Sequence, residues 1–139
     1  DLYEGGIRMP CIAWWPETIA PGGETDHISG FQDILPTLMD VAAVAKPDSI
    51  DGISFLPTLL GQTDQQQKHD YLYWEFPEQG GKVALRQHNW KLVVNQDSPP
   101  ELYDLSKDIG EANDLAGKMP EKVAELQQLL TEASTGVLQ

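Results

Sequence analysis

The sequence of 139 residues has a single cysteine and few basic residues. Cys11 cannot form an internal disulfide, and its place in an apolar run is typical of a small buried side chain. Nine lysine and arginine residues against 22 aspartate and glutamate residues give a formal net charge of −13. Because binding to nucleic-acid phosphates needs clustered cations, this composition argues against a nucleic-acid partner.

Long apolar runs are also absent. No stretch approaches the roughly 20 apolar residues that a membrane-spanning helix needs, and no signal peptide opens the sequence. The sequence begins at Asp1, without methionine and directly in a loop motif. We therefore expect a piece of a longer protein, whose preceding part would contain any export signal.

Complete catalytic motifs are missing as well. The sequence contains no phosphate-binding P-loop, no zinc-spaced Cys and His, no Gly-x-Ser-x-Gly and no calcium loop. Its three histidines, His27, His69 and His88, are far apart and lie beside loops. His27 could face a ligand or could be an ordinary loop or capping residue. The residues alone thus predict no complete active site.

The first half of the sequence predicts one strand and two helices. Met9–Trp15 is a short apolar run between prolines, which indicates a buried strand whose partners lie upstream. Apolar spacing over 34–42 predicts an amphipathic helix with Asp33 as its N-cap. A short helix is expected over 55–60, closed by Gly61.

The second half predicts a sheet covered by a helix. A polar run at 62–68 marks a boundary between two domains, 1–68 and 69–139. Four strand-like segments follow, with a helix from Pro120 whose apolar stripe should cover the sheet. The strands are expected at Tyr71–Phe76, Lys82–Arg86, Trp90–Asn95 and Glu101–Leu105, and the stripe at Val123, Leu126, Leu130 and Ala133. This order predicts an α+β layer, a four-stranded antiparallel sheet with one covering helix.

Alternation along these strands assigns side chains to the sheet faces. Lys91 and Asn95 are expected to face water. One apolar face should contain Trp74, Leu85, Trp90, Leu92 and Leu102.

The stretch Tyr3–Pro10 reads Tyr-Glu-Gly-Gly-Ile-Arg-Met-Pro. Its two glycines can take positive φ, so we expect a sharp turn between Glu4 and Arg8. These two charged residues could hold an active-site loop by hydrogen bonds, or could form an ordinary salt bridge of little consequence.

Several such stretches, taken in order, resemble type I (formylglycine-dependent) sulfatases of the alkaline-phosphatase-like superfamily. The resemblance extends from Leu2 to about Leu130. The matching stretches are Tyr3–Pro10, Ile12–Pro16, Ile19–Gly22, Phe31–Leu38, Asp51–Pro57, Tyr73–Phe76, Ala84–Arg86, Trp90–Leu92 and Glu101–Leu105. The resemblance implies the end of an α/β sulfatase domain over 1–68, followed by the α+β C-terminal subdomain.

The resemblance also implies what the whole protein would do. Its nucleophile, a formylglycine made from Cys or Ser in Cys/Ser-x-Pro-x-Arg, would lie upstream, with the calcium ligands and a sulfate-contacting lysine. The whole protein would hydrolyse sulfate esters of a small molecule or glycan, in the periplasm or after secretion. The chain alone would hold no metal and be inactive.

Four residues are the candidate site residues in this chain. Glu4 and Arg8 would support the active site, whereas Trp74 and Glu75 could meet a sugar ring and its hydroxyls. Trp74 could instead be a core residue. Arg86 could lie on the sheet surface or contact an anion.

Two other functions stay open at this point. A phosphodiesterase or phosphatase of the same superfamily would share the scaffold but use Ser or Thr with two metals. A non-catalytic binding module is also compatible with the lack of a catalytic set. Whichever function holds, the unpaired strand at Met9–Trp15 could let the chain self-associate.

Overall fold

The computed structural model describes residues 1–77 and 81–136, which divide into two compact units. One unit, the sheet unit, comprises Asp1–Pro10 and the described residues from Asp70 onward; the other, the helical unit, is Cys11–His69. The first ten residues thus group with the C-terminal sheet, not with the residues that follow them. The boundary at residue 68 as a division between domains of a longer protein stays a prediction.

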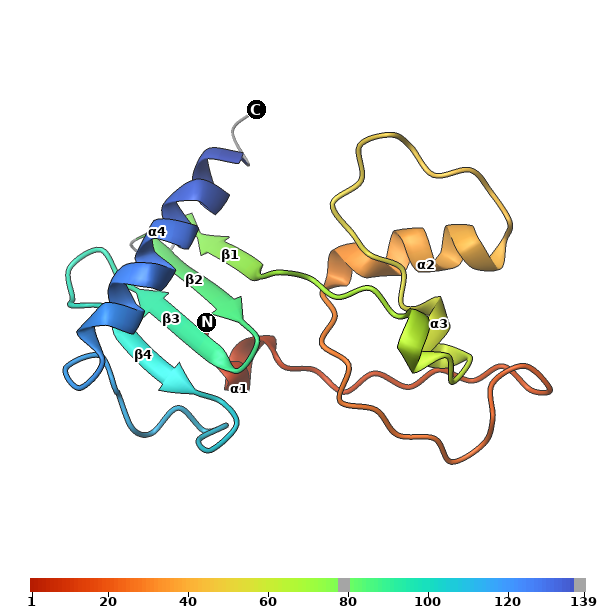
Figure 1. Cartoon of the computed structure of the whole chain (residues 1–139), viewed down its shortest axis with the longest axis horizontal. Helices are drawn as coiled ribbons and strands as arrows, with labels where there is room; N and C mark the ends of the chain where they lie inside the picture. The colour runs from red at the N-terminus through yellow and green to blue at the C-terminus, as the bar shows by residue number, and fades with distance from the viewer. Residues whose placement is uncertain (78–80, 137–139) are drawn as a thin grey trace. The chain divides into compact units, whose positions relative to one another are not determined.

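The sheet unit contains four antiparallel strands in the order β1-β2-β3-β4 (Figure 1). The strands are β1 Leu72–Phe76, β2 Lys82–Gln87, β3 Trp90–Val94 and β4 Glu101–Asp104. A two-residue turn at His88 and Asn89 joins β2 to β3, and His88 takes a φ of 54°. The predicted four-stranded sheet is confirmed.

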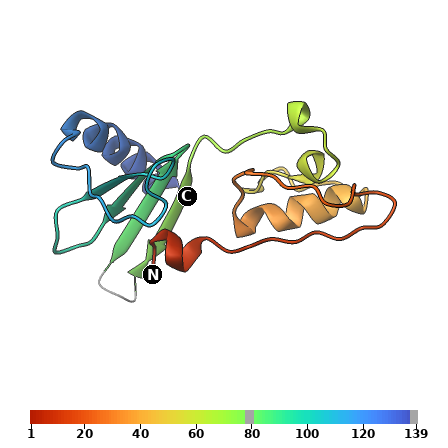
Figure 2. The ribbon, with the colours of Figure 1, turned by 90° about the horizontal axis from the view of Figure 1, so that it is seen from below.

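Helix α4, Pro120–Gly136, covers one face of this sheet (Figure 2). Pro120 begins the helix, where its missing N–H costs no hydrogen bond. The predicted apolar stripe of this helix is confirmed. Val123, Leu126 and Ala133 are buried against the sheet, and Leu130 packs beside them. The buried core of this face consists of Leu85, Leu92, Leu102, Val123, Leu126 and Ala133.

The opposite sheet face packs against the N-terminal residues. Here lies the four-residue helical turn α1, Glu4–Ile7, and Leu2 is buried. The buried members of this second core are Leu2, Ala84, Val93, Tyr103 and Leu105. Trp74 also packs here, so its predicted place beside Leu85 is wrong. The register explains the error, because Tyr73 pairs with Leu85 and the next residue must point to the other face.

Lys91 is the largest departure from the predicted faces. It was expected to face water, but its side chain is 0% exposed, and Asn95 is half-buried. The N-terminal residues cover the face to which Lys91 points. Strand alternation alone does not reveal such a cover.

The glycine pair does not make the predicted sharp turn. Gly5 and Gly6 lie within the helical turn α1, and neither takes a positive φ. Gly6 is still required for space, because a Cβ added there would lie 2.5 Å from the backbone oxygen of Asp1. The short distance indicates that α1 fits closely against the start of the chain.

The helical unit confirms both predicted helices. Its helices are the 3-10 turn Phe31–Asp33, α2 Ile34–Val41, α3 Leu56–Leu59 and the 3-10 turn Thr63–Gln65. Gly61 follows α3 with a φ of 73°, as a closing glycine should. Asp33 does not cap α2 with its side chain; its carboxylate instead accepts the Gly30 N–H at 2.7 Å, one turn earlier.

Met9–Trp15 is not the predicted buried strand. Ile12 is 92% exposed and Trp14 is 85% exposed, and Cys11 is exposed too, contrary to its expected burial. The reason is that no strand of the described residues pairs with this segment, so its backbone N–H and C=O groups have no partners in a sheet.

We expect the amides of Ile12–Trp15 to exchange with solvent far faster than those of Leu92–Val94. Among the described residues the former donate no hydrogen bond, whereas the latter lie in the centre of the sheet. Hydrogen exchange on a dilute monomer measures this difference. Equal protection in the monomer would contradict this expectation and would mean that the segment has a hydrogen-bonding partner within the chain.

Candidate functional site

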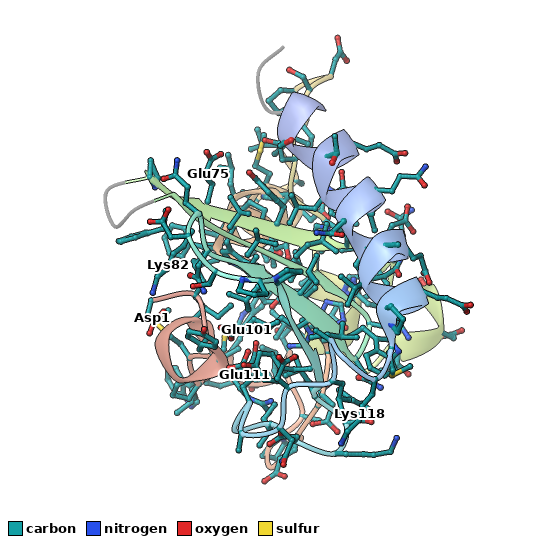
Figure 3. The ribbon with its side chains drawn as sticks, turned by 90° about the vertical axis from the view of Figure 1, so that its left-hand side faces the viewer. Asp1, Glu75, Lys82, Glu101, Glu111 and Lys118 are labelled. Atoms are coloured by element: carbon teal, nitrogen blue, oxygen red, sulfur yellow. The ribbon has the colours of Figure 1, made fainter. Side chains whose placement is uncertain are left out.

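Three buried charged residues meet beneath α1. The Nζ atom of Lys91 lies 3.0 Å from Glu4 Oε1 and 2.8 Å from Glu111 Oε1. The Glu4 backbone N–H donates to the Glu111 carboxylate, and both carboxylate side chains are at most 4% exposed. We call Lys91, Glu4 and Glu111 the Lys91 cluster. Figure 3 shows Glu111 beside the helical turn α1.

Arg86 adds a second cation at the edge of this cluster. Its Nη1 lies 3.4 Å from Glu4 Oε2, and its Nε donates to the His88 carbonyl at 2.9 Å. Burial lowers the pKa of the Arg86 guanidinium, and the charge of Glu4 opposes this effect. Arg86 therefore balances one of the two buried carboxylates, so it is more than a sheet-surface residue.

Arg8 does not join its side chain to Glu4. Its backbone N–H bonds to the Glu4 carbonyl at 2.9 Å, but its side chain is exposed. Within the described residues that side chain forms no ion pair or hydrogen bond. Sequence reasoning thus found Glu4 but paired it with the wrong cation. The supporting role of Glu4 and Arg8 in catalysis stays a prediction.

A second polar group joins the N-terminal residues to the sheet. The hydroxyls of Tyr3 and Tyr103 both donate to Glu101 Oε2, at 2.7 and 2.6 Å. The two rings meet edge to face, 6.3 Å apart. Burial, and then the Glu101 carboxylate, raise the pKa values of both phenols, so both stay protonated donors.

Trp74 and Glu75 point to opposite faces of β1. Trp74 is half-buried and packs on the second core, whereas Glu75 is exposed and accepts the Tyr73 hydroxyl at 3.0 Å. Burial, and then Glu75, raise the pKa of Tyr73 to about 12. Because adjacent residues of a strand alternate, these two residues cannot line one pocket on a single face. Their substrate contacts stay predictions.

The helical unit is organised around the carboxylate of Asp33, which is only 1% exposed. His69 Nε2 lies 2.8 and 2.9 Å from its two oxygens. Asp33 also accepts the backbone N–H groups of Gly30 at 2.7 Å and Ile53 at 2.8 Å. Sequence reasoning missed this arrangement, because nothing in the sequence links positions 36 residues apart.

The other two histidines have lesser roles. Partial burial lowers the pKa of His27, while Asp33 opposes that shift. His88 lies in the β2–β3 turn and provides its carbonyl to Arg86. Thus His27 and His69 lie in the helical unit near Asp33, and His88 lies at the end of a hairpin.

The described residues include many His, Asp and Glu side chains, which are common metal ligands. Among them, no three His, Cys, Asp or Glu side chains converge in a way that could hold a metal ion. The described part of this chain thus offers no metal site of its own. In the same part of the chain, no helix is long and apolar enough to cross a membrane.

Comparison with known proteins shows the family. The model of the family described as "N-sulphoglucosamine sulphohydrolase, C-terminal" matches residues 1–136. The chain belongs to this family and is a C-terminal portion of a sulfatase of the alkaline-phosphatase-like superfamily.

Two curated relatives show how much of such proteins the chain represents. It is 34% identical to arylsulfatase A of Homo sapiens, over 91% of this chain and 30% of that protein. It is 33% identical to N-acetylglucosamine-6-O-sulfatase of Bacteroides thetaiotaomicron, over 94% of this chain and 25% of that protein. The chain thus spans less than a third of the length of these relatives.

Solved structures share the fold. A protein in complex with its substrate D-glucosamine-2-N,6-O-disulfate superposes with a TM-score of 0.70 at 28% identity, over 87% of this chain and 27% of that one. Phosphonate monoester hydrolase of Agrobacterium radiobacter gives a TM-score of 0.63 at 22% identity, over 81% of this chain and 26% of that one. The second likeness shows a common fold alone.

Proposed function

We propose that the protein to which this chain belongs hydrolyses sulfate esters of a carbohydrate. The observation that supports this most is the family match over residues 1–136. The relatives agree with it, since one is named for a sulfated N-acetylglucosamine and one structure holds a disulfated glucosamine. A sulfated amino sugar is therefore the substrate class that we propose.

The reacting groups would come from residues outside this chain. A formylglycine would supply the nucleophile, and calcium would stabilise negative charge on the sulfate oxygens. This chain's residues would support that site. Glu4, held by Lys91 and Arg86, fixes the turn α1, and Glu101 fixes Tyr3 just before it.

Phosphate-ester or phosphonate chemistry is the second candidate, and nothing favours it over the first. The likeness to a phosphonate monoester hydrolase is at 22% identity and concerns the scaffold. A non-catalytic binding module is a third possibility for the chain in isolation. The family match over residues 1–136 favours a part of an enzyme.

Turnover measurements test this proposal. We expect the chain of 139 residues to hydrolyse no sulfate ester, even with added calcium, because the described residues contain no metal-binding cluster. The longer protein should release sulfate from a 6-O-sulfated glucosamine and act far more slowly on matched phosphate and phosphonate esters. A preference for either of the latter esters would contradict the proposal. Sulfate release by the chain alone, lost on His69→Ala, would contradict the upstream location of the site.

We also propose that the longer protein acts in the periplasm or after secretion. The residues ahead of Asp1 test this, because an export signal would lie there. The proposal would be contradicted by a native N-terminus without such a signal.

A further inference from the structure

Lys91 is a charged residue whose side chain is completely buried. Its two partners come from distant parts of the sequence, Glu4 in α1 and Glu111 in the loop after β4. An ammonium group away from water is very unfavourable unless carboxylates surround it. The position of Lys91 in the central part of the sheet therefore dictates where both carboxylates must lie.

The apolar contacts of the N-terminal residues set their position less strictly than the polar contacts of the Lys91 cluster do. Leu2 and Ile7 pack on the second core, but hydrophobic contact is not directional. The contact of Lys91 Nζ with Glu4 Oε1 at 3.0 Å is a hydrogen bond and therefore directional, whereas Glu111 Oε1 lies 2.8 Å from Lys91 Nζ as an ion pair. Glu111 also accepts the Glu4 backbone N–H. The Lys91 cluster thus fixes α1 by both a side chain and a backbone atom.

We infer that Lys91 is a positioning residue, which acts through Glu4 and Glu111 to place the α1 turn on the sheet. The placement itself is a property of this chain. Its effect on sulfate-ester hydrolysis rests on the proposed function, because the enzyme would use α1 as part of the support of its active site. Lys91 and Glu111 then belong with Glu4 in that support.

Hydrogen exchange on the chain of 139 residues tests the placement. The amides of Gly6, Ile7 and Arg8 donate within α1, so they report on whether the turn is held. In Lys91→Met we expect them to exchange at least tenfold faster, while the amides of β2 and β3 keep their protection. Lys91→Arg should recover part of the protection, because the positive charge is retained.

Lys82→Met is the matched control. Lys82 also reaches from the sheet to the N-terminal residues, but its Nζ lies 3.8 Å from Asp1 Oδ1 and both side chains are partly exposed (Figure 3). An exposed pair of this kind contributes little. The α1 amides of this variant should exchange as in the unchanged chain. If Lys82→Met and Lys91→Met have the same effect, the inference is wrong.

A second variant covers the case in which Lys91→Met does not fold. The triple variant Lys91→Met, Glu4→Gln, Glu111→Gln removes the stranded carboxylates, so the sheet should form. Its α1 amides should still exchange fast. Protection equal to that of the unchanged chain would show that packing of Leu2 and its neighbours positions α1, which would overturn the inference.

Kinetics of the longer protein test the effect on the reaction. Lys91→Met should lower kcat for sulfate-ester hydrolysis at least tenfold with little change in KM, Lys91→Arg should recover part of it, and Lys82→Met should leave it unchanged. An unaltered kcat in Lys91→Met would overturn the positioning role. If the unchanged longer protein hydrolyses no sulfate ester, the proposed function fails, while exchange in the chain still decides whether Lys91 places α1.

Discussion

Replacing Asp33 with alanine is expected to unfold the helical unit. The change removes the acceptor for His69 Nε2 and for the N–H groups of Gly30 and Ile53. A fully buried donor left without a partner costs about 1–3 kcal/mol, and these three partly buried donors together cost a few kcal/mol. A whole domain usually has only about 5–15 kcal/mol of stability.

The helical unit has little apolar burial to offset this loss. Among residues 11–69, only Asp33, Pro36 and Thr37 are buried. Thr37 is bonded to the same residue, because its hydroxyl donates to the Asp33 backbone carbonyl at 2.6 Å. The same hydroxyl accepts the Phe55 N–H at 2.9 Å. The unit is thus held together mainly by hydrogen bonds around Asp33.

Hydrogen exchange and NMR dispersion of residues 11–69 measure the outcome. The amides of Ile53, Phe55 and Leu59 should lose their protection in Asp33→Ala, and Asp33→Asn should retain some, because its amide oxygen still accepts a bond. Asp40→Ala is the control, since it removes a carboxylate from α2 whose partner, Lys46, is partly exposed. Retained protection in Asp33→Ala would mean that other contacts hold the unit.

Replacing Leu92 with alanine is expected to lower the free energy of unfolding of the sheet unit by about 2–5 kcal/mol. Leu92 is 0% exposed and pairs with Leu85 on one side and Leu102 on the other, both also 0% exposed. Helix α4 covers all three, so the vacated space cannot fill with water or close easily.

Denaturant unfolding followed by tryptophan fluorescence measures this change. Ile109→Ala is the control in the same unit, because Ile109 is 46% exposed and should change stability by no more than about 0.5 kcal/mol. A similar loss in the two variants would show that the core described around Leu92 does not dominate the stability of this unit.

Local patterns in the sequence determined the elements that depend only on near neighbours. Period-two alternation and turn residues placed the four strands, and spacing by three and four placed α2 and α4. Pro120 and Gly61 marked ends of helices because their backbone preferences are intrinsic. The order of short motifs also indicated the sulfatase family, because motifs can be recognised in a sequence without knowing which residues are in contact.

Only the tertiary structure decided which distant side chains meet. Lys91 looks like a solvent-facing strand residue until the N-terminal residues cover it and bring Glu4 and Glu111 to its ammonium. Asp33 looks like a helix cap until His69 reaches its carboxylate. Met9–Trp15 has the composition of a strand but lacks a neighbour among the described residues. The burial of a charge and the pairing of a strand are both fixed by what packs against them, which local sequence does not specify.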